Sequence, residues 1–295
     1  MDNYNGTGRF ISILSDYGFK VTFGNESDTT FLKKALQALI DSPTPITSVK
    51  FVKNEMAALT SDSRSGIYDL ACVDEKGSHF IVEMQLSEYP EFIQRMKFYA
   101  LHRFNTMVKK GNYKFEKLPK IYCIGILAID IFPKIGDYHN IAVLRNEKNE
   151  IIDDQLTFVT VELAKFTKQL SDIQTDLDKL IFTMKALHSN TEPTQYPKFW
   201  NERWLNKAIK ELDTRAMTPE QRLQFEMVIS ANALAIKNEK KKIENAKILE
   251  NLAVKTSSIT KLLQRGKLTI EEIAEDNSVD VDFVIDIQQK MNDAK

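Results

Sequence analysis

The sequence is poor in cysteine, with only Cys72 and Cys123 among its 295 residues. Both lie in apolar, strand-like runs, a pattern that favours two buried thiols in a reducing compartment over a disulfide. Neither they nor the four histidines have the spacing of metal ligands. We therefore expect no disulfide framework and no structural zinc site.

Long apolar runs and a strong net charge are also missing. No apolar run approaches the roughly 20 residues that span a bilayer. The N-terminus is polar and has neither the basic nor the apolar region of a signal peptide. We therefore expect a cytoplasmic protein without a membrane partner. The formal net charge is −1, so any DNA-binding surface must be local.

The rest of the composition is that of a globular protein, and the pattern changes once along the chain. Hydrophobic residues make up 43% of the sequence and charged residues 27%, which is enough apolar material for a sizeable core. Residues 1–28 lack clear periodicity, and helical spacing begins at about residue 29, with Asp28 as the expected N-cap. The elements expected after that are a strand in 46–56, a hairpin in 66–85, a helix from Pro90 to about 110, a strand in 121–129 and weaker strands in 140–146 and 155–163.

Strand signals vanish from about residue 167, and charged helical segments follow. We expect helices in 167–188, 196–212 and 218–254, and two or three short helices in 258–290. Thr218 and Thr269 each begin a capping box. The pattern predicts a mixed α/β fold with an αβββαβ core over residues 1–166 and an α-helical extension over 167–295.

Residues 66–85 are the most informative segment for function. Two apolar runs flank a short glycine-containing turn, as in a β-hairpin. Asp69 lies in the first expected strand, and Glu83 and Gln85 lie in the second. Because strand side chains alternate, Glu83 and Gln85 point to the same face. Carboxylates on neighbouring strands can hold a hard divalent cation such as Mg²⁺, with a main-chain carbonyl near Met84 as a further ligand.

The alternative is that these acids are merely solvated at the ends of strands. Against it stands the apolar surrounding of Glu83, because a charge in such a run is costly to bury without a partner. Gln85 can position a water molecule through its amide, but it brings no positive charge.

These residues carry a resemblance to the PD-(D/E)XK nuclease superfamily, and within it to the transposase-like, recombination-promoting nuclease (Rpn) family. The resemblance covers residues 9–170 strongly and the C-terminal tail loosely. The matching segments are 16–20 with Phe23 and Gly24, 68–70, 81–85, Arg95 with Tyr99, 111–113, 161–163 with Lys165 and Phe166, and 263–273.

The resemblance implies a restriction-endonuclease-like fold and DNA cleavage that depends on Mg²⁺ or Mn²⁺. Asp69 and Glu83 correspond to the metal-binding acids, and Gln85 stands where the superfamily pattern has lysine. Tyr68 replaces the proline of the motif. A further acid from the N-terminal region is implied, and the candidates are Asp16, Glu26 and Asp28.

Several basic and helical features allow more than one interpretation. Arg95 and Lys97 are candidates for DNA-phosphate contacts, although a solvated helix face would look similar. The lysines in 237–247 alternate with acids and favour an exposed helix. Residues 258–289 resemble a helix-turn-helix, but their second helix is acidic, so packing is the default role.

The sequence thus predicts a Mg²⁺-dependent DNA endonuclease with Asp69, Glu83 and Gln85 as catalytic residues. The alternative is a catalytically weak or inactive DNA- or partner-binding protein that keeps the nuclease fold. The helical extension is a candidate surface for homo-oligomer formation, and Trp200 and Trp204 are expected to anchor it on the core.

Overall fold

The computed structural model describes residues 8–53, 55–56, 66–86, 91–108, 114–190 and 196–293. The chain forms two compact units, Met1–Phe225 and Glu226–Lys295. All the strands that the structure describes lie in the first unit, and the described part of the second is helical. The expected start and end of the helix at Pro90 and residue 110, and the expected segment 111–113, fall outside the described residues.

A six-stranded mixed sheet organises the first unit. Strands β1, β4 and β5 pair antiparallel, β5, β6 and β8 pair parallel, and β7 returns antiparallel to β8. Their order in the sheet is β1 (Val49–Phe51), β4 (Leu70–Asp74), β5 (His79–Gln85), β6 (Ile121–Leu127), β8 (Ile151–Glu162) and β7 (His139–Arg145). Two short strands, β2 (Glu55–Met56) and β3 (Gly66–Ile67), form a separate pair.

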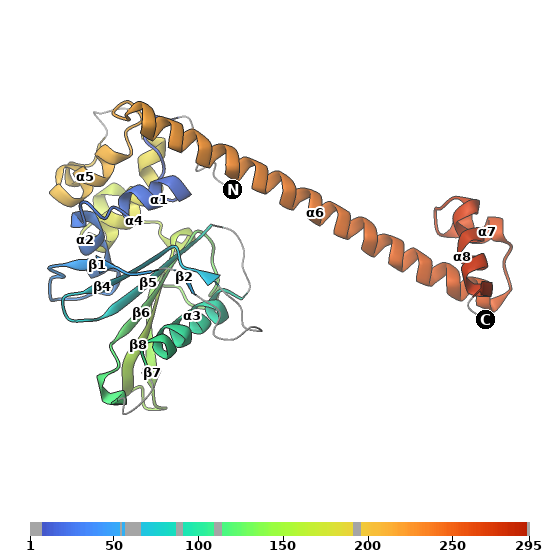
Figure 1. Ribbon diagram of the computed structural model, residues 1–295, viewed down its shortest axis with the longest axis horizontal. Helices are drawn as coiled ribbons and strands as arrows, with labels where there is room; N and C mark the ends of the chain where they lie inside the picture. Colours follow the sequence, from blue (N-terminus) through green and yellow to red (C-terminus); the bar gives the residue numbers. More distant parts are fainter. Residues whose placement is uncertain are drawn as a thin grey trace. The chain divides into compact units, whose positions relative to one another are not determined.

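Helices cover both faces of this sheet. Helix α3 (Phe92–Met107) lies along one face, and α1 (Asp16–Thr22), α2 (Thr30–Leu39), α4 (Asp176–Ala186) and α5 (Arg203–Glu211) gather on the other side (Figure 1). The succession α2, β1, β4, β5, α3, β6 confirms the predicted αβββαβ order and the mixed α/β class. Short 3₁₀ turns occur at Phe115–Lys117, Leu163–Lys165, Leu170–Asp172, Leu187–Ser189 and Lys198–Asn201.

Near the N-terminus the structure adds one short helix and corrects one predicted cap. Within residues 1–28, expected to be mostly irregular, α1 forms, capped by the Ser15 hydroxyl, which accepts a hydrogen bond from the Gly18 N–H at 3.0 Å. A helix of seven residues is too short to reveal a 3.6-residue period. Asp28 is not the N-cap of α2, because Thr29 takes that position and the Asp28 carboxylate accepts the Thr30 N–H at 3.0 Å.

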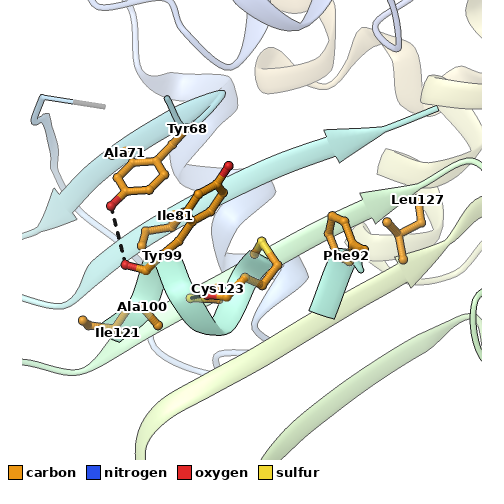
Figure 2. Close-up of a cluster of buried hydrophobic side chains, with 10 residues drawn as sticks. Tyr68, Ala71, Ile81, Phe92, Tyr99, Ala100, Ile121, Cys123 and Leu127 are labelled. Carbon is orange, nitrogen blue, oxygen red and sulfur yellow. Dashed lines mark hydrogen bonds between the residues drawn. The ribbon is translucent and has the colours of Figure 1, made fainter. Parts of the chain in front are cut away.

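The core between α3 and the sheet is a cluster of buried apolar side chains (Figure 2). The ring of Tyr99 on α3 lies edge-on to that of Tyr68, with the ring centroids 4.9 Å apart. The Tyr68 hydroxyl donates a hydrogen bond to the Tyr99 carbonyl at 3.5 Å, drawn as a dashed line in Figure 2. The expectation that Tyr99 belongs to the core is confirmed.

The tryptophans anchor the later helices on this unit, as the sequence predicted. The Trp204 ring stacks on Phe31 of α2 with centroids 5.8 Å apart. The Trp200 indole N–H donates to the Thr183 hydroxyl at 2.9 Å. Residues beyond 166 pack on the sheet unit in this way, and the first compact unit extends to Phe225. The expected domain boundary at residue 166, placed where the strand signals end, stays a prediction.

The second unit contains most of α6 (Pro219–Arg265), with α7 (Ile270–Asp276) and α8 (Val281–Asp293). Helix α6 continues to Arg265, so the expected end at residue 254 was wrong. Both predicted capping boxes form, at Thr218 with Gln221 and at Thr269 with Glu272. The end of α6 packs on α7 and α8 through a small apolar cluster of Ile259, Ile273, Ala274, Val284 and Ile287.

Among the described residues, the protein has no helix with the length and apolar character that crossing a membrane requires.

A buried acid ties α4 to the rest of the first unit. Asp178 is 0% exposed and occupies the third position of α4, in a capping box with Thr175. Its carboxylate accepts hydrogen bonds from the Tyr138 hydroxyl at 2.8 Å and the Lys168 ammonium at 2.7 Å. Burial alone would raise its pKa, but these partners and the N–H groups of the cap lower the pKa to about 2.

We expect Asp178→Asn to lower the free energy of unfolding by about 1–2 kcal/mol at pH 7, since a depressed folded-state pKa stabilises the fold above the unfolded pKa. This stabilisation is lost as pH falls through the interval between the unfolded and folded pKa values, so variant and wild type should converge near pH 2. Urea unfolding followed by tryptophan fluorescence measures this unit, because both tryptophans lie in it. Asp154→Asn, at an exposed ion pair with Lys120, is the control. A deficit for Asp178→Asn that stays constant down to pH 2 would contradict the expectation.

Candidate metal centre at the end of the central hairpin

The β4–β5 hairpin places Asp69 and Glu83 opposite each other. Its turn passes through Gly77, whose φ of +82° suits glycine. The register pairs Leu70 with Val82, so the next step along the ladder pairs Asp69 with Glu83. Asp69 immediately precedes β4, rather than lying within the strand as expected. The predicted hairpin and its predicted pair of acids are therefore brought together.

The Asp69 carboxylate reaches across the hairpin. Its Oδ2 accepts a hydrogen bond from the Met84 backbone N–H at 2.7 Å, which fixes it beside Glu83. Although Asp69 is exposed as a residue, burial of its carboxyl group raises its pKa, against the opposing effects of Met84 and Arg95. The negative charge of Asp16 raises the pKa further.

Glu83 is buried in the sheet face that α3 covers, and only 4% of it is exposed. Burial raises its pKa to about 8, the neighbouring Asp69 charge adds to this, and the Arg95 guanidinium acts in the opposite direction. Within the part of the chain that the structure describes, Glu83 Oε1 is a buried oxygen without a hydrogen-bond partner. A buried acceptor without a partner is costly and needs an explanation, such as an ion.

Arg95 on α3 points into this site. Its guanidinium Nη2 donates to Gln85 Oε1 at 3.1 Å and to Glu83 Oε2 at 3.4 Å. The guanidinium carbon lies 5.7 Å from the ring centroid of Phe92 and 5.9 Å from that of Tyr99. Glu83 and Gln85 thus share one face, as the alternation of strand side chains predicts.

A glycine opens the space for this arrangement, and the sequence reasoning missed it. Gly125 of β6 pairs with Glu83. A Cβ built at Gly125 would lie 2.6 Å from two ring carbons of Phe92. The ring therefore occupies the space over the glycine, beside Glu83 and beneath Arg95. A glycine inside an apolar strand run was the available signal, because such glycines often permit close approach.

The structure gives the other candidate residues different surroundings. Asp16, in the first turn of α1, acts electrostatically on Asp69. Glu26 is exposed in the turn between α1 and α2. Asp28 forms an ion pair with Lys207 of α5, and its carboxylate accepts the Thr30 N–H at the start of α2, which assigns it a structural role. Lys97 is exposed on α3.

The donor set fits a hard divalent cation with few protein ligands. No group of three acidic, histidine or cysteine side chains suited to an ion exists within the residues described. Mg²⁺ commonly takes only one or two carboxylates and keeps several waters, so a pair of carboxylates is compatible with such an ion. When both acids are ionised, one guanidinium leaves a local excess of negative charge that a cation would offset.

Glu162 and Lys165, which the sequence singled out, hold a loop. The Glu162 side chain is 0% exposed, and its Oε1 accepts the N–H groups of Ile131 at 2.6 Å and Phe132 at 3.0 Å. Lys165 Nζ bonds Glu162 Oε2 at 2.7 Å and the carbonyls of Phe132 and Ile135. This pair fixes the segment after β6, at the end of the sheet where β5 also ends.

An αβββαβ core with paired acids on its central hairpin defines the class of PD-(D/E)XK nuclease folds. The chain belongs to the PD-(D/E)XK nuclease family transposase group, whose family model matches residues 13–233. No curated protein and no solved structure matches the chain. The match starts just before α1 and ends within α6, so it includes every strand and helix that contributes to the candidate site.

We expect Gly125→Ala to lower the free energy of unfolding by about 1–3 kcal/mol, because the added methyl group overpacks the space filled by Phe92. Gly136→Ala is the matched control, since a Cβ there meets nothing within 4 Å. Urea unfolding followed by tryptophan fluorescence would compare the two. Equal stability of the two variants would contradict the assigned packing of Phe92 on Gly125.

Proposed function

We propose that this protein is a DNA endonuclease that depends on Mg²⁺ or Mn²⁺, of the transposase-like, recombination-promoting type. The observation that carries the proposal is the convergence of Asp69 and Glu83 from neighbouring strands, with Glu83 Oε1 buried and lacking a partner among the described residues. Membership of a nuclease family of transposases supports DNA as the substrate.

Asp69 and Glu83 are the proposed ligands of the cation. When bound, such an ion polarises a phosphodiester and lowers the pKa of a water molecule. Glu83 offers Oε1 for this purpose while its Oε2 faces Arg95. Asp69 keeps its position through the Met84 N–H, so the strand backbone orients one ligand and α3 orients the other.

The reaction is a hydrolysis, and it consumes one water. The water oxygen forms a bond to phosphorus, the bond between phosphorus and one sugar oxygen breaks, the water loses a proton and the departing oxygen gains one. Gln85 is the proposed residue that holds the attacking water, because its amide can donate and accept hydrogen bonds. Lys97, exposed on α3, is the proposed contact to a flanking phosphate.

A DNA- or partner-binding protein with weak or absent catalysis is the second candidate. The observation that favours it is Gln85, because an amide adjacent to two acids adds no positive charge of its own. The plasmid-cleavage experiment described below separates the two functions.

Formation of a homo-oligomer through the helical extension stays a prediction, which light scattering on the full chain would test.

We expect Asp69→Asn and Glu83→Gln each to lower the rate of plasmid cleavage by about 100-fold or more, because each removes charge that stabilises the transition state. Both substitutions preserve side-chain volume. Excess chelator should abolish wild-type cleavage, and added Mg²⁺ or Mn²⁺ should restore it. Glu147→Gln, at an exposed turn between β7 and β8, is the control. Cleavage at the wild-type rate by both site variants would reject the proposed site, and absence of cleavage by wild type under all these conditions would favour the binding function.

Among the three N-terminal acids, Asp16 is the proposed additional acid of the site. We expect Asp16→Asn to reduce cleavage by about 10-fold, because it removes one negative charge that acts on Asp69 and on a bound cation. Glu26→Gln, which alters an exposed acid, provides the comparison. Single-turnover rates at saturating Mg²⁺ measure both. A larger loss for Glu26→Gln than for Asp16→Asn would overturn this assignment.

A further inference from the structure

Gln85 has a charged partner that the strand sequence does not reveal. Arg95 is ten residues away in the chain and lies on α3, and its Nη2 is 3.1 Å from Gln85 Oε1. The Gln85 amide is therefore adjacent to a full positive charge, although the residue itself is neutral.

The contact with Arg95 determines which atom of the Gln85 side-chain amide, oxygen or nitrogen, faces away from α3. A guanidinium can only donate hydrogen bonds, so the Gln85 atom that faces Arg95 must be the carbonyl oxygen. The NH₂ group, on the other branch of the same amide, is then directed away from Arg95. The positively charged guanidinium of Arg95 on the carbonyl oxygen also polarises the amide and makes the N–H groups of Gln85 stronger hydrogen-bond donors.

Arg95 is held firmly enough to perform this role. The same Nη2 donates to Glu83 Oε2 at 3.4 Å, and the guanidinium lies near the rings of Phe92 and Tyr99. Phe92 in turn rests on Gly125, the residue that pairs with Glu83. The planar guanidinium of arginine suits a position beside aromatic rings better than a lysine ammonium does.

We propose that Arg95 and Gln85 act as one unit, in which Arg95 is a positioning residue that turns the Gln85 NH₂ group toward the attacking water and supplies the positive charge of the site. The unit provides what a lysine at position 85 would provide alone, namely a donor and a charge. This inference rests on the proposed function. Its alternative is that Arg95 contacts a DNA phosphate directly and independently of Gln85.

A set of four variants separates these roles. We expect Arg95→Gln to reduce the single-turnover cleavage rate by about 100-fold, a loss typical for one electrostatic group of an active site. Gln85→Lys combined with Arg95→Gln should recover most of the rate that Arg95→Gln alone loses, since contacting residues couple strongly. Lys148→Gln, which removes an exposed cation at the β7–β8 turn, should have no effect.

Recovery by Gln85→Lys is the result that a purely structural role for Arg95 does not predict. If Arg95 instead contacts phosphate, the double variant stays as slow as Arg95→Gln, and DNA affinity becomes less salt-dependent in both. That result would overturn the inference. Arg95→Lys retains the charge without the planar fork and should lie between wild type and Arg95→Gln, which keeps the test informative if Arg95→Gln folds poorly.

Binding of Mn²⁺, measured by electron paramagnetic resonance without DNA, tests the inference apart from activity. Arg95→Gln should bind Mn²⁺ about 5-fold more tightly and Gln85→Lys correspondingly more weakly, because a cation beside the carboxylates repels the ion. If wild type cleaves no DNA, the proposed function fails while this comparison still decides whether Arg95 supplies the charge of the site. Unchanged Mn²⁺ affinity in both variants would overturn the inference.

Discussion

The buried carboxylate of Glu83 is the constraint around which the first unit is arranged. An acid in an apolar sheet face loses its hydration, and its pKa rises to about 8 as a result. One guanidinium, from Arg95, compensates it in part, while a second acid, Asp69, makes the local excess of negative charge larger. Such an arrangement reduces stability and persists only where the surrounding packing imposes it, and the proposed cation is what would give it a purpose.

The surrounding packing is rigid and comes from regular elements. The residue just before β4 and strand β5 supply the acids, the parallel pairing of β5 with β6 places Gly125 beside Glu83, and α3 supplies Arg95 and Phe92. Sites on helices and strands hold their geometry more closely than sites on loops. The helices on the opposite side complete the sheet's burial, with Trp204 stacked on Phe31. Glu162 and Lys165 fix the segment that follows β6, so the chain at the end of the central strands, beside the site, is also held in place.

Much of the fold was predictable because its signals are local. The hairpin followed from two apolar runs and a glycine turn, the buried strand β6 from a continuous apolar run, and the helix starts at Thr218 and Thr269 from their capping boxes. The differences from the predicted elements concerned the lengths of two helices. Helix α1 was too short to display a period, and α6 continued to Arg265, past the expected end at residue 254. The compact unit reaches Phe225 because contacts of Trp200 and Trp204 are formed across distant segments, which no local pattern contains.

By itself the sequence determined which chemical groups share a face. Strand alternation places Glu83 and Gln85 together, and the hairpin register brings Asp69 opposite Glu83, since both depend on steps of one or two residues along neighbouring strands. Only the tertiary structure decided that Arg95 turns toward these groups, that Phe92 lies on Gly125, and that Asp16 is the N-terminal acid that acts on Asp69. These relations join residues from separate elements, and the docking of one element on another depends on the packing of the whole core, which no spacing within a single element records.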